Sequence, residues 1–194
     1  MRVMYLKVRN MKRLSNDQRG FTLIELVMAM AVATIIMAAA SYGILHTFNL
    51  NTRNTNYMTA VREAQNAGYW VTHDTAMAYA GEMLDGSVGV VTSATPTGFP
   101  LMLRWLDSDN LSITHSCNYT LENNGGAPWT LWRKLDGDAK TQVAQYISSS
   151  NTTCIYNPTA RKLTFTVTAT VTARKITTGT ETRIYEVSPR PGTQ

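Results

Sequence analysis

The chain has 194 residues, a formal charge of +5 and 44% hydrophobic residues, which is enough for one folded domain and a further segment. Residues 1–20 contain six Lys or Arg and one Asp, whereas residues 21–194 contain 12 Lys or Arg and 12 Asp or Glu. The basic character thus belongs to the first 20 residues. No net charge for nucleic-acid binding is predicted for residues 21–194.

The first stretch, residues 1–20, is a basic leader without apolar periodicity, and we do not expect it to fold. The stretch that follows, residues 21–50, contains no Lys, Arg, Asp or Glu after Glu25. Its apolar part, Leu26–Leu45, is about as long as a helix needs to cross a ~30 Å hydrocarbon layer. We therefore predict a transmembrane helix in residues 21–50, with the basic leader on the cytoplasmic side.

The junction of these two stretches differs from an ordinary secretory signal. Such a signal has its apolar core before the cleavage site, whereas here the natural cut lies between Gly20 and Phe21, ahead of the apolar segment. That segment would remain as the mature N-terminus. Glu25 also indicates a partner, because a carboxylate costs about 2.5–3.5 kcal/mol at the centre of a membrane helix, and less near an interface.

The residues Gly20, Phe21, Thr22, Leu23 and Glu25 resemble the class III signal of type IV pilins and pseudopilins. The resemblance implies that a prepilin peptidase cleaves between Gly20 and Phe21 and methylates the new amine of Phe21. It also implies that Glu25 partners the N-terminal ammonium of a neighbouring subunit during assembly. Pairing of Glu25 with the N-terminus of its own helix remains an alternative.

Proteins of this type have a lollipop shape, so the resemblance implies an α+β fold with a long N-terminal helix packed on an antiparallel sheet. It implies a minor pilin or pseudopilin, a filament subunit and not an enzyme, held in the inner membrane by a single pass with its head outside the cytoplasm. The implied partners are the peptidase, other pilins, the assembly platform and the lipid bilayer. Val61–Ala80 and Trp132–Leu135 resemble minor pilins of the pseudopilin J and PilW type. The alternative is a membrane-anchored binding protein that does not polymerise.

Residues 51–194 are expected to form the head, with a helix over 51–85 and strands over 86–194. Along this helix a narrow stripe of mostly small residues recurs at spacings of three and four, and such a stripe is suited to lying across a sheet. Its members are Tyr57, Val61, Ala64, Gly68, Val71, Thr75 and Ala78. The charged residues of this helix are expected to face away from the sheet: Arg62, Glu63, Asp74 and Glu82. The pair Asp85–Gly86 is the expected end of the helix.

The pattern of the head changes to that of strands after Gly86. The expected strands are Val88–Thr92, Leu101–Leu106, Leu111–Leu121, Trp129–Leu135, Thr141–Ile147, Lys162–Ala173 and Arg183–Val187. In Lys162–Ala173 apolar residues alternate with threonine, so its apolar face should pack on the helix. The expected turns and loops are Asp107–Asn110, Asn123–Gly126, Asp136–Asp138, Ser148–Thr153 and Thr177–Thr180.

The two cysteines, Cys117 and Cys154, both fall in the expected extracytoplasmic head, where a disulfide between them is the favoured prediction. A metal site with His115 is a weaker alternative, and no cofactor or metal is predicted. The carboxylates of Asp107–Asp109 and Asp136–Asp138 could bind calcium, but turn formation is the favoured interpretation. No phosphate-binding loop, nucleophile elbow or zinc-binding helix motif is present, so no enzyme is predicted.

Overall fold

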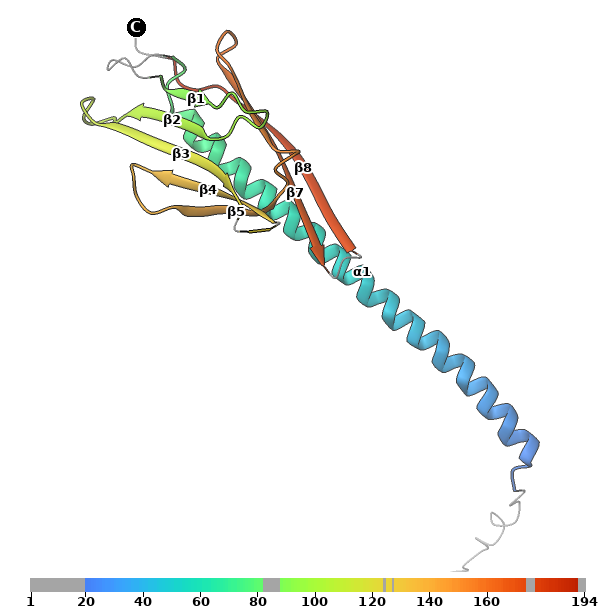
Figure 1. The fold of residues 1–194 in the computed structure, drawn as a ribbon. Helices are drawn as coiled ribbons and strands as arrows, with labels where there is room; N and C mark the ends of the chain where they lie inside the picture. The colour runs from blue at the N-terminus through green and yellow to red at the C-terminus, as the bar shows by residue number, and fades with distance from the viewer. Residues whose placement is uncertain (1–19, 82–87, 124, 127, 174–176, 192–194) are drawn as a thin grey trace, which may run out of the picture. The chain divides into compact units, whose positions relative to one another are not determined.

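The computed structural model describes residues 20–81, 88–123, 125–126, 128–173 and 177–191. In these residues one helix precedes eight strands that form a single antiparallel sheet (Figure 1). The elements are α1 (Leu23–Met77), β1 (Val90–Thr92), β2 (Leu101–Leu106), β3 (Thr114–Glu122), β4 (Trp129–Leu135), β5 (Thr141–Ile147), β6 (Thr153–Asn157), β7 (Lys162–Ala173) and β8 (Thr177–Val187). The predicted α+β class, with a long N-terminal helix packed on an antiparallel sheet, is confirmed.

The chain divides into two compact units, one ending at Thr47 and the other beginning at Phe48. The described part of the first unit is the start of α1, and all of its residues are exposed. The second unit contains the rest of α1 and the whole sheet, and it holds every residue of the hydrophobic core. We call the second unit the head.

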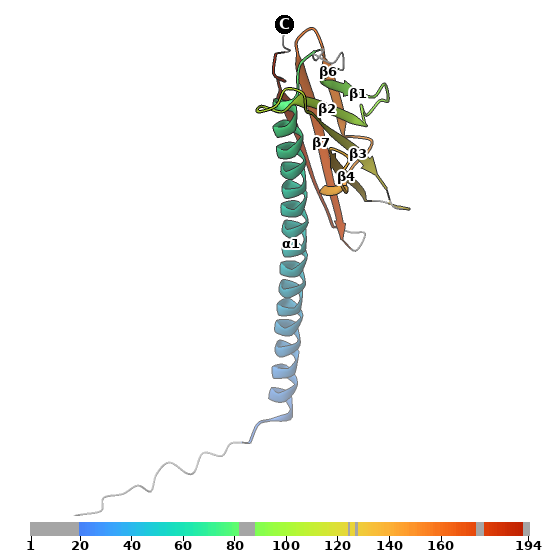
Figure 2. The ribbon, with the colours of Figure 1, turned by 90° about the vertical axis from the view of Figure 1, so that its left-hand side faces the viewer.

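The sheet of the head has the strand order β1-β2-β3-β4-β5-β7-β6, and β8 pairs with β7. Figure 2 shows strands of this sheet beside the head part of α1. The strands at the two ends of this order, β1 and β6, contact each other, so the sheet is curled. The longest pairing joins β7 and β8, from Leu163↔Val187 to Ala173↔Thr177. This pairing follows from the alternation of apolar residues and threonine in β7, because both residue types suit a pleated, half-buried strand.

Small residues allow the head part of α1 to lie close to the sheet. Ala60, Ala64 and Ala67 are fully buried in the same core as Phe165 of β7. A Cβ atom on Gly68 would lie 2.0 Å from the ring of Tyr185, so only glycine fits there without a shift of that ring. Five members of the predicted stripe are buried as expected: Ala64, Gly68, Val71, Thr75 and Ala78. Tyr57, which was expected in the stripe, is 46% exposed.

The prediction that the charged residues of α1 face away from the sheet is wrong for two of them. Asp74 is only 1% exposed, and Glu63 accepts a hydrogen bond from the backbone N–H of Gln145 at 2.7 Å. β5 pairs with β7 only at Ile147↔Ala169, so the Glu63 carboxylate provides an acceptor for an N–H group of β5. Glu82 lies outside the described residues.

Helix α1 ends at Met77, earlier than the predicted end at Asp85–Gly86, a pair that lies outside the described residues. The physical reason is competition for backbone hydrogen bonds. The N–H of Tyr79 donates to the carbonyl of Arg104 on β2 at 3.1 Å, and the N–H of Ala80 donates to the carbonyl of Arg190 at 2.7 Å. The chain therefore leaves the helix where it joins other backbone segments.

Most predicted strands agree with the structure. The bounds of β2, β4, β5 and β7 are those predicted, and β1 and β3 start two and three residues later than expected. The strand β6 was missed, because Thr153–Asn157 follows a polar run that is typical of a loop. Thr177–Thr180, predicted as a turn, begins β8 instead.

Candidate functional site: the start of helix α1 and its buried carboxylate

The motif residues Thr22 and Glu25 form the start of helix α1. The N–H of Glu25 donates to the hydroxyl oxygen of Thr22 at 3.3 Å, and that hydroxyl lies 3.4 Å from Oε2 of Glu25. The N–H of Leu26 donates to the carbonyl of Thr22 at 3.2 Å. Thr followed by Glu three residues later is a known signature of a helix N-terminus. Sequence analysis assigned Glu25 to assembly, with pairing to the N-terminus of its own helix as the alternative, but it did not use this helix-start signature.

The predicted cleavage site, between Gly20 and Phe21, precedes the first helical residue Leu23. Both residues are exposed, and 84% of the surface of Phe21 is accessible. A Cβ atom on Gly20 would meet nothing within 4 Å, and its φ is not in the left-handed region. Nothing in the fold of the described residues therefore requires glycine at position 20. An enzyme that reads this position would explain the glycine.

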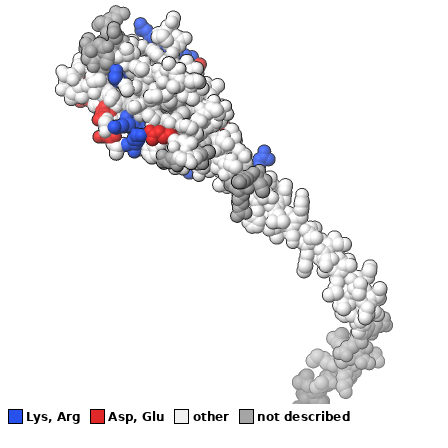
Figure 3. Space-filling view, viewed as in Figure 1, with Lys and Arg blue, Asp and Glu red and all other residues white. Residues whose placement is uncertain are grey.

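The apolar part of α1 in the first unit has no cover from the described chain. Its large side chains are more than half exposed, including Ile35 at 70% and Met37 at 69%. On its visible face Figure 3 shows no Lys, Arg, Asp or Glu, whereas charges of both signs are mixed on the head. Helix α1 is the one described helix that is long and apolar enough to cross a membrane. Exposed apolar surface of this extent marks contact with lipid or with other helices.

Three hydroxyl groups of this apolar stretch are satisfied within the helix itself. The hydroxyls of Thr34, Ser41 and Thr47 donate to carbonyls three or four residues earlier, at 2.8, 2.8 and 2.9 Å. Such bonds make hydroxyl groups compatible with a medium that offers no water. The stretch also contains Gly43, where an added Cβ atom would meet nothing within 4 Å. These are the properties of a helix that is stable in lipid and open to close approach by neighbours.

A second cluster of polar groups lies in the head, around the buried carboxylate of Asp74. The Nε and Nη2 atoms of Arg133 donate to Asp74 at 2.7 and 3.2 Å. The hydroxyl of Tyr119 donates at 2.5 Å and the thiol of Cys117 at 3.2 Å. The ring Nδ1 of His73 lies 3.2 Å from Oδ1 of Asp74. The cluster thus joins α1 to β3 and β4.

The hydrogen-bond partners of Asp74 favour the ionised form of its carboxyl group. Burial alone would raise the pKa of this carboxyl, but the hydrogen bonds from Arg133, Tyr119, Cys117 and His73 outweigh burial and hold the pKa below its usual value. Burial and the neighbouring Asp74 raise the pKa of both Tyr119 and Cys117, so both remain protonated donors. The cluster is a structural ion pair between Asp74 and Arg133, to which the protonated Tyr119 and Cys117 also donate.

The predicted disulfide is absent from the structure, in which Cys117 and Cys154 are two separate buried thiols. Cys117 lies on β3 and points to Asp74, whereas Cys154 lies on β6, and these strands are not neighbours in the sheet. Burial raises the pKa of Cys154 to about 12, so neither thiol has the character of a reactive thiolate. The alternative metal site with His115 finds no support in the described residues, where no group of three such ligands could hold a metal ion.

The two acidic turns that were considered for calcium come together around His115. Its Nδ1 lies 2.6 Å from Oδ2 of Asp136, and its Nε2 lies 3.1 Å from Oδ2 of Asp107. The remaining oxygens accept backbone N–H groups, from Asp109 and Asn110 in one turn and from Ser116 on β3 in the other. Both carboxylates are therefore used by the turns and by His115, as the interpretation of these segments as turns predicted.

Comparison with known proteins gives one match, and it falls on the start of α1. Residues 15–41 match the family described as the prokaryotic N-terminal methylation motif. No curated protein and no solved structure matches the chain. The matched segment contains the exposed Gly20–Phe21 bond, the Thr22–Glu25 helix start and most of the uncovered apolar helix. The chain thus carries the N-terminal methylation motif at the start of α1, which supports a relation to the type IV pilin and pseudopilin family.

Proposed function

We propose that this protein is a minor pilin or pseudopilin, a structural subunit of a type IV pilus or of a type II secretion-like filament. The observation that carries the proposal is an apolar helix that is wholly uncovered and begins at a methylation motif. The protein would be anchored in the inner membrane by a single pass, with its head outside the cytoplasm. The loose resemblance to the pseudopilin J and PilW group favours a minor subunit.

Processing is the first step of this proposal. Prepilin peptidase would cleave between Gly20 and Phe21, and the new amine of Phe21 would be methylated, a modification that keeps its charge. The exposed bond and a glycine that the fold does not require support this step. The protein is then a substrate and not an enzyme.

Assembly is the second step, and Glu25 is the residue on which it depends. After cleavage the amine would lie four residues before Glu25, about one helical turn away. A neighbour shifted by about one turn would bring its amine level with this carboxylate. Two opposite charges in lipid attract strongly, whereas each charge alone is costly to bury. Among the described residues, the side chain and the N–H of Glu25 make local hydrogen-bond contacts with Thr22 at the helix start.

The test of processing is the N-terminal sequence and intact mass of membrane-extracted protein, expressed with and without a prepilin peptidase. We expect an N-terminus at Phe21, about 14 Da heavier when methylated. Gly20→Leu should remain uncleaved with a correctly folded head. Gly126→Leu is the matched control, because a Cβ atom there also meets nothing within 4 Å. An intact wild-type N-terminus in the presence of active peptidase would refute the proposal.

The test of assembly uses Glu25→Ala in cells that produce the remaining filament components. We expect membrane insertion and cleavage to persist while incorporation into filaments is lost. Thr22→Ala is a useful comparison, because it removes the helix cap but leaves the acid in place. Normal filament incorporation of Glu25→Ala would favour the alternative function, a membrane-anchored binding protein that does not polymerise.

A further inference from the structure

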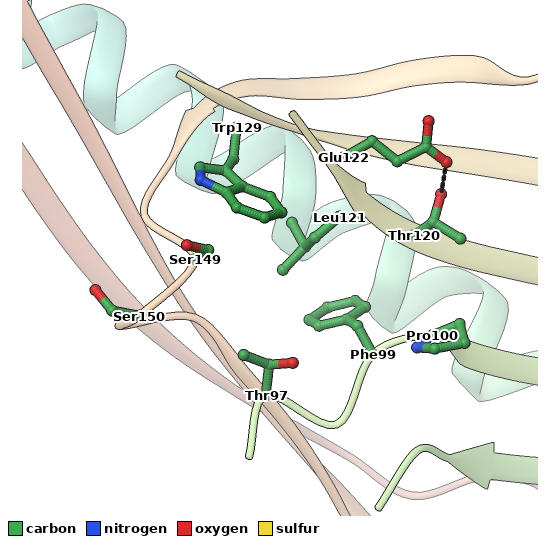
Figure 4. A pocket seen from close by; sticks show the side chains of 9 residues that line it. All are labelled: Thr97, Phe99, Pro100, Thr120, Leu121, Glu122, Trp129, Ser149 and Ser150. Carbon is green, nitrogen blue, oxygen red and sulfur yellow. Dashed lines mark hydrogen bonds between the residues drawn. The ribbon is translucent and has the colours of Figure 1, made fainter. Parts of the chain in front are cut away.

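A pocket of about 510 Å³ opens in the head between the β1–β2 loop, the strands β3 and β4 and the β5–β6 loop (Figure 4). Its size is within the range of about 300–1,000 Å³ that is usual for small-molecule sites. It is separate from the start of α1 and from the Asp74 cluster. The residues that line it are Thr97, Phe99, Pro100, Thr120, Leu121, Glu122, Trp129, Ser149 and Ser150.

One wall of the pocket is apolar. Phe99, Leu121 and Trp129 come from three different elements and converge on the same space in Figure 4. The ring of Phe99 is held edge-to-face against Phe165 of β7, with centroids 6.2 Å apart. Phe99 itself is buried, whereas Leu121 and Trp129 are only half-buried. The half-buried side chains leave apolar surface for a ligand to cover.

The opposite wall carries hydroxyl groups, from Thr97 of the β1–β2 loop and from Ser149 and Ser150 of the β5–β6 loop. Backbone contacts fix the position of this wall. The N–H of Cys154 on β6 donates to the carbonyl of Thr97 in the β1–β2 loop at 2.8 Å. This loop lies so close to β6 that a Cβ atom on Gly98 would lie 1.8 Å from the carbonyl oxygen of Cys154. The walls are therefore preformed, as expected of a binding site.

The pocket offers hydrogen-bonding groups but no free charge. Its one charged lining residue, Glu122, accepts from Thr120 and pairs with Lys140, and in Figure 4 its carboxylate points away from the pocket. Within the described residues, neither the indole N–H of Trp129 nor the hydroxyl of Ser149 makes a hydrogen bond to the protein. These groups are available to a ligand, and the lack of a free charge favours a neutral one.

We propose that this pocket binds a neutral carbohydrate. A sugar ring has a face of C–H groups that packs on an indole or phenyl ring, and hydroxyls at its rim that both donate and accept hydrogen bonds. Trp129, Leu121 and Phe99 match the apolar face, while Ser149, Ser150 and Thr97 match the rim, since their hydroxyls can also donate and accept. A peptide would instead need a strand edge or backbone groups, and the polar groups of this pocket are side chains.

The proposal is tested by titrating the full-length protein, in nanodiscs of neutral lipid, with neutral trisaccharides. Maltotriose, cellotriose and triacetylchitotriose present different linkages, and isothermal calorimetry or saturation-transfer NMR reports their binding. We expect at least one to bind, and an oligosaccharide of uronic acids of the same length to bind more weakly. No binding of any neutral trisaccharide at about 10 mM would overturn the proposal.

Substitutions in and outside the pocket test whether the trisaccharide binds there. Trp129→Ala should weaken it by about tenfold or more, because it removes both the apolar face and the indole donor. Ser149→Ala should weaken it by about two- to tenfold and leaves the core untouched, so it remains decisive if Trp129→Ala fails to fold. Trp70→Ala, a tryptophan on α1 outside the pocket, is the matched control and should have no effect. Equal affinity in wild type and Ser149→Ala would overturn the proposal.

The site stands independently of the proposed filament role. The same titration with Glu25→Ala protein should give the affinity of the wild type, because Glu25 lies outside the head. A failure of assembly and a failure of sugar binding would therefore be seen in different experiments. Tighter binding of an uncharged aromatic peptide than of any trisaccharide would also refute the proposal, in favour of a protein ligand.

Discussion

The two parts of helix α1 use small residues in opposite ways. In the head, Ala60, Ala64 and Ala67 are fully buried against the sheet of the same chain. In the first unit, the six alanines from Ala29 to Ala40 and the nearby Gly43 are exposed, and nothing in the described chain covers them. Small residues allow close approach in both cases, but only the head contains the partner. The first part of the helix leaves its small residues open to contact with groups outside the described chain.

The polar groups of the two parts of α1 also differ in where their hydrogen-bond partners lie. The hydroxyls of the first part donate to carbonyls of their own helix, whereas Asp74 and Glu63 in the head bind groups on β3, β4 and β5. A helix that enters lipid must satisfy its own polar groups, and a helix packed on a sheet can share them. The comparison predicts that substitutions in the head lower its stability, and that matched substitutions in the first part do not.

The largest effect is expected for Asp74→Ala. The change leaves Arg133 and Tyr119 without their acceptor in a buried site, which costs about 3–5 kcal/mol in the free energy of unfolding. Urea unfolding of the full chain in detergent, followed by tryptophan fluorescence, measures this, because all four tryptophans lie in the head. Arg62→Ala, an exposed change on the same helix, should alter stability little. A loss below about 1 kcal/mol for Asp74→Ala would show that the cluster does not join helix and sheet.

The next largest effect on the free energy of unfolding is expected for Gly68→Ala, and it is compared with the same change at Gly43 of the same helix. Gly68→Ala places a Cβ atom 2.0 Å from the ring of Tyr185, and overpacking of this kind costs about 1–3 kcal/mol, partly offset by the better helix propensity of alanine. Gly43→Ala meets nothing, so only the gain in propensity remains. Both are measured by the same urea unfolding. Equal stability of the two variants would contradict the assignment of Gly68 to the close contact.

A smaller effect is expected at the gap between β5 and β7. Glu63→Ala removes the acceptor for the N–H of Gln145 and should lower stability by about 1–3 kcal/mol. Glu63→Gln keeps an acceptor oxygen of the same reach and should retain most of the stability. The hydrogen-exchange rate of the Gln145 backbone N–H reports on this contact locally. We expect this rate to rise in Glu63→Ala but not in Glu63→Gln. Unchanged exchange in Glu63→Ala would mean that another group satisfies this N–H.

The smallest effect is pH-dependent and concerns His115. The carboxylates of Asp136 and Asp107 raise the pKa of His115, and His115 in turn lowers the pKa of Asp107. A raised pKa means that the stabilisation is complete below about pH 6.5, the unfolded value, and is lost as the pH rises through the folded pKa. The stability difference between wild type and His115→Asn should be largest near pH 5–6 and smallest near pH 9. A difference that grows with pH would contradict the paired geometry.

Local sequence patterns predicted much of this architecture. The bounds of β7 followed from its alternation, and those of β2, β4 and β5 from apolar runs between turn residues. The helix start was implicit in Thr22 and Glu25, and Gly20–Phe21 marked the junction with the leader. These features depend on neighbours in sequence, so a single sequence is enough to find them.

The sequence did not predict the features that depend on distant residues. Asp74 was expected to face water because charged residues usually do, and its burial depends on Arg133, 59 residues away. The helix ends at Met77 because β2 and Arg190 take the next backbone groups. The pocket likewise consists of residues from four separate segments of the head, and no local pattern marks it.

The internal hydrogen bonds of the first part of α1 have a consequence for the fate of the subunit. Because Thr34, Ser41 and Thr47 bond to their own backbone, a move from lipid into a bundle of similar helices breaks none of these bonds. The move exchanges apolar contacts with lipid for apolar contacts with neighbours. Glu25 is the one charge in this stretch whose surroundings change. The first part of α1 can therefore exchange lipid for a bundle of similar helices without losing the hydrogen bonds of these three hydroxyls.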